Sequence, residues 1–185
     1  MSSPTGLSAG PRSGVVDRAL RAWPWAGLVA RLVLAGVFVT AGALKLPDPA
    51  ESVRAVRAYR LLPEAVVPAL GYGLPLFEVA LGLLLVVGLA VRLAAVASGV
   101  LLVLFVVGVG AAWARGLQID CGCFGGGGEV GPGETEYGRE VARDLGLLAL
   151  AGLLAWRPRT RLSLDSFLSL HDDHHDDPET EHHAA

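Results

Sequence analysis

The sequence predicts an all-α polytopic membrane protein, a bundle of four transmembrane helices with a short amphipathic helix between the first two spans. Apolar residues make up 52% of the 185-residue chain and charged residues only 18%, which is more hydrophobic than a soluble domain requires. The apolar residues gather in runs long enough to cross a bilayer, for which a helix needs about 20 mostly apolar residues. Several such runs in one short chain could not be covered by the remaining polar residues, so these two observations exclude a soluble core.

Four segments have the length and composition of a span. They cover residues 25–46, 70–90, 93–113 and 137–156. The fourth is the weakest, because Arg139, Glu140, Arg143 and Asp144 lie in its first turns.

The connection between the first two spans predicts the amphipathic helix, in the stretch PAESVRAVRAYRLL at residues 49–62. Its apolar residues would lie on the membrane and its arginines would face water. The apolar residues are Val53, Val56, Leu61 and Leu62, and the arginines are Arg54 and Arg57.

Composition divides the chain into three regions. We expect a disordered arm over residues 1–22, the membrane domain over residues 23–160, and an acidic His-rich disordered tail over residues 161–185. We expect no cleavable signal peptide, because the first apolar run is of span length and lacks a clear cleavage site. The formal net charge of −3 comes largely from the tail, and no basic face indicates nucleic-acid binding.

The orientation in the membrane rests on weaker signals, because Lys and Arg are almost evenly divided between the two sides. The RPRTR stretch follows the last span directly, whereas the long connection before it is acidic. We therefore expect a multi-pass protein of the inner (plasma) membrane with both termini cytoplasmic. Arg31, in the inner half of the first span, is expected to snorkel toward the cytoplasmic face.

The motif Asp120-Cys121-Gly122-Cys123 lies in the connection of residues 114–136, which this orientation places outside the cytoplasm. Glycine between the cysteines permits the bend that a small disulfide ring needs, and a strained, exposed disulfide exchanges readily. Three other interpretations remain open: two unreactive thiols, half of a metal site completed elsewhere, or a permanent local disulfide. We assign no metal site, because the connection lacks a four-ligand zinc set. The glycines at 125–128 are interpreted as a flexible lid or hinge.

Ionisable residues of the spans fall on the same side as this motif. They predict a polar pocket beneath it, formed by Lys45, Glu78, Arg143 and Asp144 together with Asp120. A cation there, Lys45 or Arg143, could stabilise a thiolate. In the alternative interpretation Lys45 snorkels, Arg143 and Asp144 lie at the interface, and Glu78 alone is buried.

Three stretches of the sequence resemble the MauE group of the DoxX-like membrane proteins, over about residues 28–158. They are RLVLAGVFVTAGALKL, GLPLFEVALGLLLVVG and DCGCFG. The resemblance implies a four-helix integral membrane protein. It also implies that Cys121 and Cys123 match the family's cysteine motif and that Lys45 and Glu78 match its polar positions. The name-giving member serves methylamine utilisation, where it is associated with maturation of the disulfide-rich small subunit of methylamine dehydrogenase and with a thioredoxin-like partner.

The function expected from these features is that of a membrane thiol–disulfide oxidoreductase. Cys121 and Cys123 would exchange electrons with a thioredoxin-like extracytoplasmic protein, and a quinone is the candidate acceptor. We expect Cys123 to attack first, because Phe124 and the glycines follow it. The alternative is a non-catalytic membrane subunit or small-solute carrier, in which Glu78 and Lys45 would be the working residues.

Overall fold

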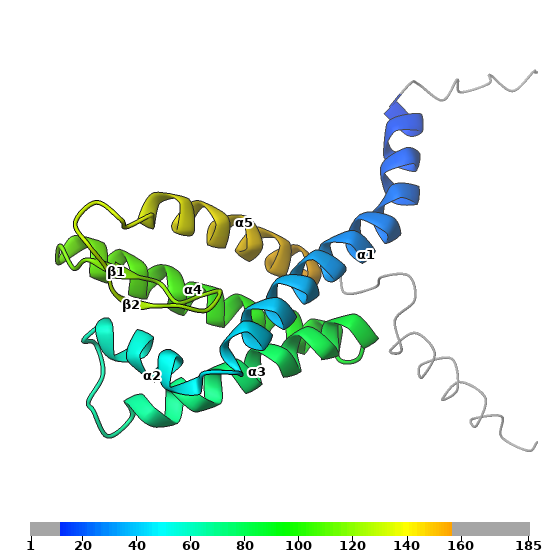
Figure 1. Cartoon of the computed structure of the whole chain (residues 1–185). Helices are drawn as coiled ribbons and strands as arrows, with labels where there is room; N and C mark the ends of the chain where they lie inside the picture. Colours follow the sequence, from blue (N-terminus) through cyan, green and yellow to red (C-terminus); the bar gives the residue numbers. More distant parts are fainter. Residues whose placement is uncertain (1–11, 157–185) are drawn as a thin grey trace, which may run out of the picture.

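The computed structural model describes residues 12–156, with the backbone alone for residues 12–24, and it confirms the all-α prediction. Four long helices make up the bundle (Figure 1): α1 (Arg12–Lys45), α3 (Val67–Val87), α4 (Val91–Ala114) and α5 (Tyr137–Trp156). The short elements α2, β1 and β2 lie together at one side of the bundle. The C-termini of α1 and α4 and the N-termini of α3 and α5 point toward this side.

Three of these helices are long and apolar enough to cross a membrane, over Trp25–Lys45, Val67–Val87 and Val91–Ala114. Helix α5 has the predicted bounds, but its charged first turns keep it out of this group, so the fourth span stays a prediction. Large apolar side chains cover the outside of the three helices, as a lipid-facing surface requires. Examples with more than two-fifths of their surface exposed are Val29, Leu32, Leu76, Phe77, Leu83, Leu93, Val100, Leu104 and Val107.

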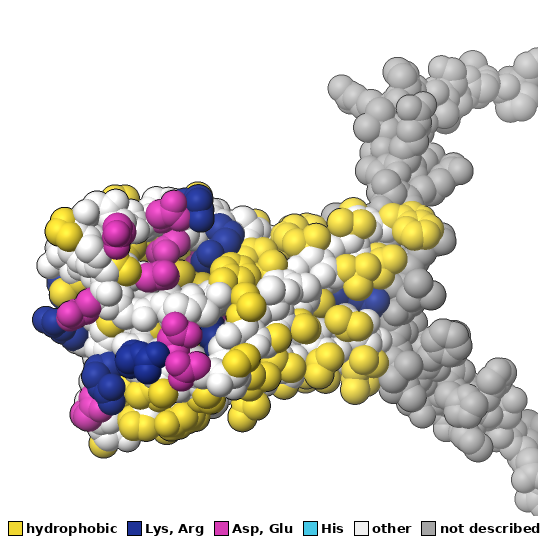
Figure 2. Space-filling model, viewed as in Figure 1, with side chains coloured by type: hydrophobic (Ala, Val, Ile, Leu, Met, Phe, Trp, Pro, Cys, Tyr) yellow, Lys and Arg dark blue, Asp and Glu magenta, His cyan; other side chains and the backbone are white. Residues whose placement is uncertain are grey.

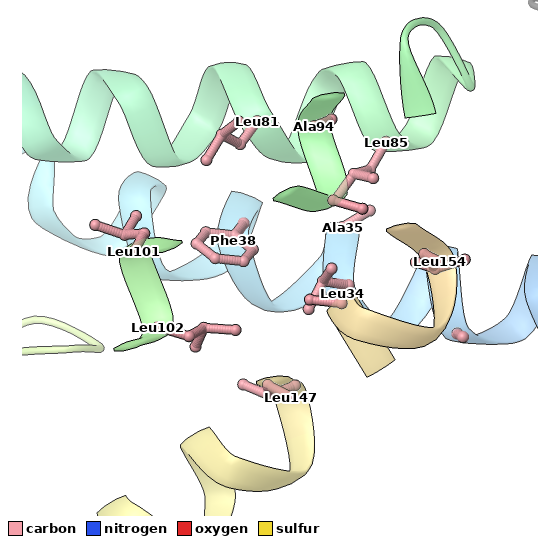
Figure 3. Packing of buried hydrophobic residues seen from close by; sticks show 13 residues of the cluster. Leu34, Ala35, Phe38, Leu81, Leu85, Ala94, Leu101, Leu102, Leu147 and Leu154 are labelled. Carbon is pink, nitrogen blue, oxygen red and sulfur yellow. The ribbon is translucent and has the colours of Figure 1, made fainter. Parts of the chain in front are cut away.

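Close helix packing explains the glycines within the spans. A Cβ atom on Gly42 of α1 would lie 2.6 Å from the carbonyl oxygen of Pro75, and one on Gly82 of α3 would lie 2.6 Å from Val39 Cγ2. Small residues let backbones approach in this way in lipid. Helix α1 thus packs mainly on α3, and α4 mainly on α5. Between them lies the apolar core (Figure 3), which includes Leu34, Phe38, Leu81, Leu85, Leu102, Leu147 and Leu154.

The amphipathic helix is present as α2 (Pro49–Ala58). It begins where Asp48 caps it, because the Asp48 side chain accepts a hydrogen bond of 3.1 Å from the Glu51 backbone amide and Pro49 suits the first helical position.

The expected placement of its apolar face on the membrane is wrong in part. Val53 is 7% exposed and packs against α3, where a Cβ on Gly71 would lie 2.5 Å from Val53 Cγ2. Leu61 and Leu62 follow the end of the helix and are exposed. Helix α2 is therefore held by the protein, and its outward face carries Arg54 and Arg57, paired with Asp48 and Glu64.

Two short antiparallel strands connect α4 to α5. Strand β1 (Ile119–Asp120) pairs with β2 (Gly128–Glu129), so the cysteine motif and most of the glycine run form the turn of a hairpin. Gly127 has φ +97°, and a Cβ there would lie 2.6 Å from Ala55 Cβ of α2. The run interpreted as a lid or hinge therefore has a packing role, since it lets the hairpin lie directly on α2.

Charged side chains gather at this end of the molecule. Figure 2 shows acidic and basic groups over α2, the hairpin and the start of α5, whereas the rest of that face is mainly apolar. Two expectations about the other end need correction. Helix α1 already begins at Arg12, so residues 12–22 of the expected disordered arm are helical, and Arg31 is 2% exposed rather than snorkelling. Residues 1–11 and the expected tail at 161–185 lie outside the described residues.

Candidate functional site

The turn of the hairpin holds the two cysteines side by side as free thiols. The Cys123 backbone amide donates to Cys121 Sγ at 3.2 Å. One residue before the pair, Asp120 Oδ1 accepts a hydrogen bond of 3.0 Å from the Gly122 amide. Such a bond from an aspartate to the amide two residues on fixes a tight turn, so the spacing of the two thiols is set by the local sequence.

Only glycine fits between these cysteines. Gly122 has φ +66°, a left-handed conformation that a residue with a Cβ adopts at a cost. A Cβ there would also lie 2.8 Å from Ala55 Cβ, which is closer than non-bonded carbon atoms come in proteins. Helix α2 thus presses on the turn from outside and fixes its position.

A tyrosine that the sequence analysis missed anchors the turn to α2. The Tyr59 hydroxyl donates to the Cys121 carbonyl oxygen at 3.1 Å, and Arg115 of the α4 end donates to the Tyr59 carbonyl oxygen. Burial, together with the neighbouring Cys123 and Cys121, raises the pKa of Tyr59, so its hydroxyl stays a donor. No sequence motif marks this residue, which is identified only by the contact.

The two thiols differ in access. Cys123, which was expected to attack first, is 6% exposed, whereas Cys121 is half-buried and therefore the more accessible of the two. The hydrogen bond with Cys123 and burial raise the pKa of the Cys121 thiol. Reactive cysteines usually have a lowered pKa; in this conformation Cys121 is therefore a protonated thiol at neutral pH.

Beneath the turn lies a buried ion pair. Lys45 Nζ donates to both carboxylate oxygens of Glu78, at 2.8 and 2.9 Å, and the two side chains are 6% and 1% exposed. The ammonium also lies 5.8 Å from the centre of the Phe105 ring. Lys45 therefore does not snorkel, and it lines a cavity that also reaches Cys121 and Cys123.

The opposite wall comes from α5. The Arg143 guanidinium pairs with Asp144 Oδ1 at 2.8 Å and lies 4.9 Å from the centre of the Phe124 ring. Asp144 is 2% exposed, so it is not an interfacial residue. A second cavity on this side is lined by Glu78, Arg143, Asp144 and Cys123, and otherwise by apolar residues. The expected pocket residues thus surround the cysteine motif from two sides.

A further carboxylate joins the site from the first turn of α5. The ligand atoms of Asp120, Cys121 and Glu140 all lie within 4.8 Å of one another. The sequence analysis named Glu140 only as a charge that weakened the fourth span. Its position four residues before Asp144, hence on the same helix face, was the signal available.

Two comparisons with known proteins point to the same family. The family described as Methylamine utilisation protein MauE matches residues 23–157. A methylamine utilization protein MauE from Paracoccus denitrificans is 39% identical over 95 residues, which are 51% of this chain and 51% of that protein. The chain thus aligns with about half the length of this relative. No solved structure matches the chain.

Proposed function

The chain belongs to the family of methylamine utilisation protein MauE, and on this basis we propose that it is a membrane thiol–disulfide redox component that supports disulfide formation in an extracytoplasmic protein. The observation that carries the proposal is the pair of reduced cysteines, Cys121 and Cys123, fixed side by side at the polar end of the bundle. They are the only two cysteines in the sequence, so a thiol–disulfide cycle within this chain would use both of them. From the family's description and the relative's name we propose that the pathway served is methylamine utilisation.

The proposed reaction starts from the Cys121–Cys123 disulfide and ends in the dithiol. A thiolate of the partner attacks one sulfur of this disulfide, the bond between the two cysteines breaks, and a mixed disulfide forms. The partner's second thiolate then displaces the cysteine. The partner leaves with a new disulfide, and the chain retains two electrons and two protons as two thiols. The partner we propose carries two thiols on a thioredoxin-like fold.

The difference in access assigns the two roles. Cys121 is the more exposed thiol, so it is the sulfur that a protein partner reaches and on which the mixed disulfide forms. Cys123 is buried and next to it, so it is the sulfur that leaves as a thiolate and takes up a proton when the partner opens the disulfide. Reoxidation requires a two-electron acceptor, for which we propose a membrane quinone.

The same proposal sets the location. Disulfides persist in extracytoplasmic compartments and are reduced in the cytosol. We therefore propose that the chain lies in the inner membrane, with the hairpin outside and both termini in the cytoplasm. Since the chain has two cysteines, both in the hairpin turn, a membrane-impermeant maleimide tests this directly. Intact cells should be labelled after mild reduction, and labelling that requires permeabilisation would reverse the orientation.

Serine variants test the chemistry. Cys121→Ser and Cys123→Ser should each abolish growth on methylamine while leaving membrane insertion unchanged, because a hydroxyl cannot replace the sulfur in thiol exchange. Given the oxidised partner, Cys123→Ser should also trap a mixed disulfide, because the reduced Cys121 attacks the partner's disulfide in the reverse of the second step and the Cys123 thiol that would release the partner is missing. This species should appear on a non-reducing gel, whereas Cys121→Ser should not form it.

A specific outcome would favour the other class of function. If both serine variants insert normally and support full growth, the redox proposal is wrong. The chain would then act as a non-catalytic subunit or a small-solute carrier, with the buried Lys45–Glu78 pair as its working element.

A further inference from the structure

Three potential metal ligands converge at the edge of the hairpin. They are the Asp120 carboxylate at the end of β1, the Cys121 sulfur in the turn, and the Glu140 carboxylate in the first turn of α5. Each pair of ligand atoms lies within 4.8 Å, although the residues come from two elements separated by the rest of the hairpin. Such convergence of two carboxylates on a thiol requires a reason, because like charges repel each other in a partly buried site.

The position of Glu140 is the second observation. Cys121 interacts with its carboxylate, but the Oε2 atom is shielded from solvent and has no hydrogen-bond partner among the residues that the structure describes. A buried carboxylate oxygen without a partner is costly. Arg143, one turn further along α5, attracts this carboxylate from a distance, but its guanidinium pairs with Asp144. Glu136, one turn earlier, shows the contrast, since it is exposed and pairs with Arg139.

We propose that Asp120, Cys121 and Glu140 bind a divalent transition metal ion of the zinc class when the cysteines are reduced. A thiolate selects ions of this class over Ca²⁺ and Mg²⁺, which prefer oxygen ligands. Three protein ligands leave one coordination position for water, as in open zinc sites. The ligand atoms need to move inward by only a fraction of their present separation, and the Asp120 and Glu140 side chains can do this by rotation.

Metal binding at this site would compete with disulfide formation. The ion displaces the Cys121 proton and takes up the thiolate, so the sulfur is no longer available to Cys123. The inference does not rest on the proposed redox function, because it requires only that Cys121 be reduced, as it is in the structure. Cys123 is not a member of the cluster, which distinguishes this site from one that uses the thiol pair.

Cobalt(II) is the probe that tests the site on the full-length protein in detergent. A thiolate bound to Co²⁺ gives a charge-transfer band in the near ultraviolet, whereas the histidines and carboxylates of residues 171–185 supply no thiolate and cannot produce it. We expect one equivalent of Co²⁺ to give the band in the reduced wild-type protein and in Cys123→Ser, and Cys121→Ser to abolish it.

Two further variants remove a carboxylate ligand with little change in shape. Glu140→Gln and Asp120→Asn should each weaken Co²⁺ binding by at least about tenfold; asparagine keeps the oxygen that accepts the Gly122 amide. Glu136→Gln, the exposed control in the same segment, should bind as the wild type does. Zn²⁺ should slow oxidation of the cysteine pair in the wild type and in Glu136→Gln, but not in Glu140→Gln.

Each contrary result overturns the inference. The wild type without a charge-transfer band shows that there is no thiolate site. Loss of the band in Cys123→Ser as in Cys121→Ser shows that the thiol pair, not this cluster, binds the ion. Unchanged affinity in both Glu140→Gln and Asp120→Asn shows that the carboxylates are not ligands. Helical circular dichroism of each variant, equal to that of the wild type, separates these results from misfolding, and two independent carboxylate variants keep the test decisive.

Discussion

A double-mutant cycle on Lys45 and Glu78 tests how the floor of the site is held together. The two side chains are 6% and 1% exposed, and the Lys45 ammonium binds both carboxylate oxygens at 2.8 and 2.9 Å. Lys45→Met or Glu78→Gln alone leaves the other charge buried and unpaired, which should lower the free energy of unfolding by about 3–5 kcal/mol. The double variant buries no charge and should lie within about 2 kcal/mol of the wild type.

The measurable quantity is therefore the coupling energy, which we expect to be at least about 2 kcal/mol. It is obtained from reversible unfolding of the purified protein in mixed micelles of dodecyl sulfate and a mild detergent, followed by helical circular dichroism. The exposed pair Arg60–Glu129 is the matched control, at 2.7 Å with side chains 64% and 71% exposed. The cycle of Arg60→Met and Glu129→Gln should give a coupling below about 1 kcal/mol.

Additive losses at Lys45 and Glu78 would refute this reasoning. They would mean that each charge is compensated independently in the folded protein, by water or by other groups, and that the close approach of the two side chains contributes nothing specific. Equal coupling in the buried and the exposed cycle would refute it in a second way, because burial would then not decide the strength of the pair.

Three other perturbations address the turn itself. Gly122→Ala should destabilise the hairpin by about 1–3 kcal/mol, and Ala55→Gly should recover part of that loss by removing the contact at 2.8 Å, as thermal unfolding of the single and double variants would show. Tyr59→Phe should speed alkylation of Cys121, because it removes the 3.1 Å hydrogen bond that anchors the turn; an unchanged alkylation rate would mean that packing on α2 alone holds it. The alkylation rate of Cys121 in the wild type should still be rising at about pH 9, where an ordinary thiol is mostly ionised, because its pKa is raised and the thiolate is the reactive form; a plateau at or below about pH 8 would contradict this.

The helices could be predicted from the sequence because their signal is local. A span is an apolar run of fixed length, so the fourth helix has its predicted bounds, and the helices α3 and α4 begin and end within three residues of them. The beginning of α1 could not be found in this way, since residues 12–24 lack the apolar run that marks a span although they are helical. The hairpin could not be predicted either, because strands of two residues are too short to show an alternating pattern of apolar and polar residues.

The sequence indicated some residues of the candidate site but not how they are arranged. Charges at membrane depth are rare enough that Lys45 and Glu78 were conspicuous, and the structure pairs them. Contacts between segments distant in the sequence could not be predicted from the residue types. Nothing in the sequence distinguishes Tyr59, at the end of α2, and only the structure shows that its hydroxyl donates to the Cys121 carbonyl oxygen. Glu140 was counted only as a charge that weakened the fourth span. Its place four residues before Asp144 put it on the same helix face, but nothing in the sequence brings that face to the turn.

The same arrangement explains why the site does not activate Cys121 as a nucleophile in its reduced state. Lys45 lines the cavity beneath the thiols, but both of its charge-assisted bonds go to Glu78, and Arg143 is likewise taken by Asp144. The two cations that could have stabilised a thiolate are thus neutralised by buried carboxylates, and the pKa of Cys121 is raised rather than lowered. Cys121 is therefore held as a protonated thiol in the reduced state, and the pair gives up its electrons only to the two-electron acceptor proposed above. In the oxidised state the attacking thiolate belongs to the partner, so the first exchange step needs no cation of this site to activate Cys121.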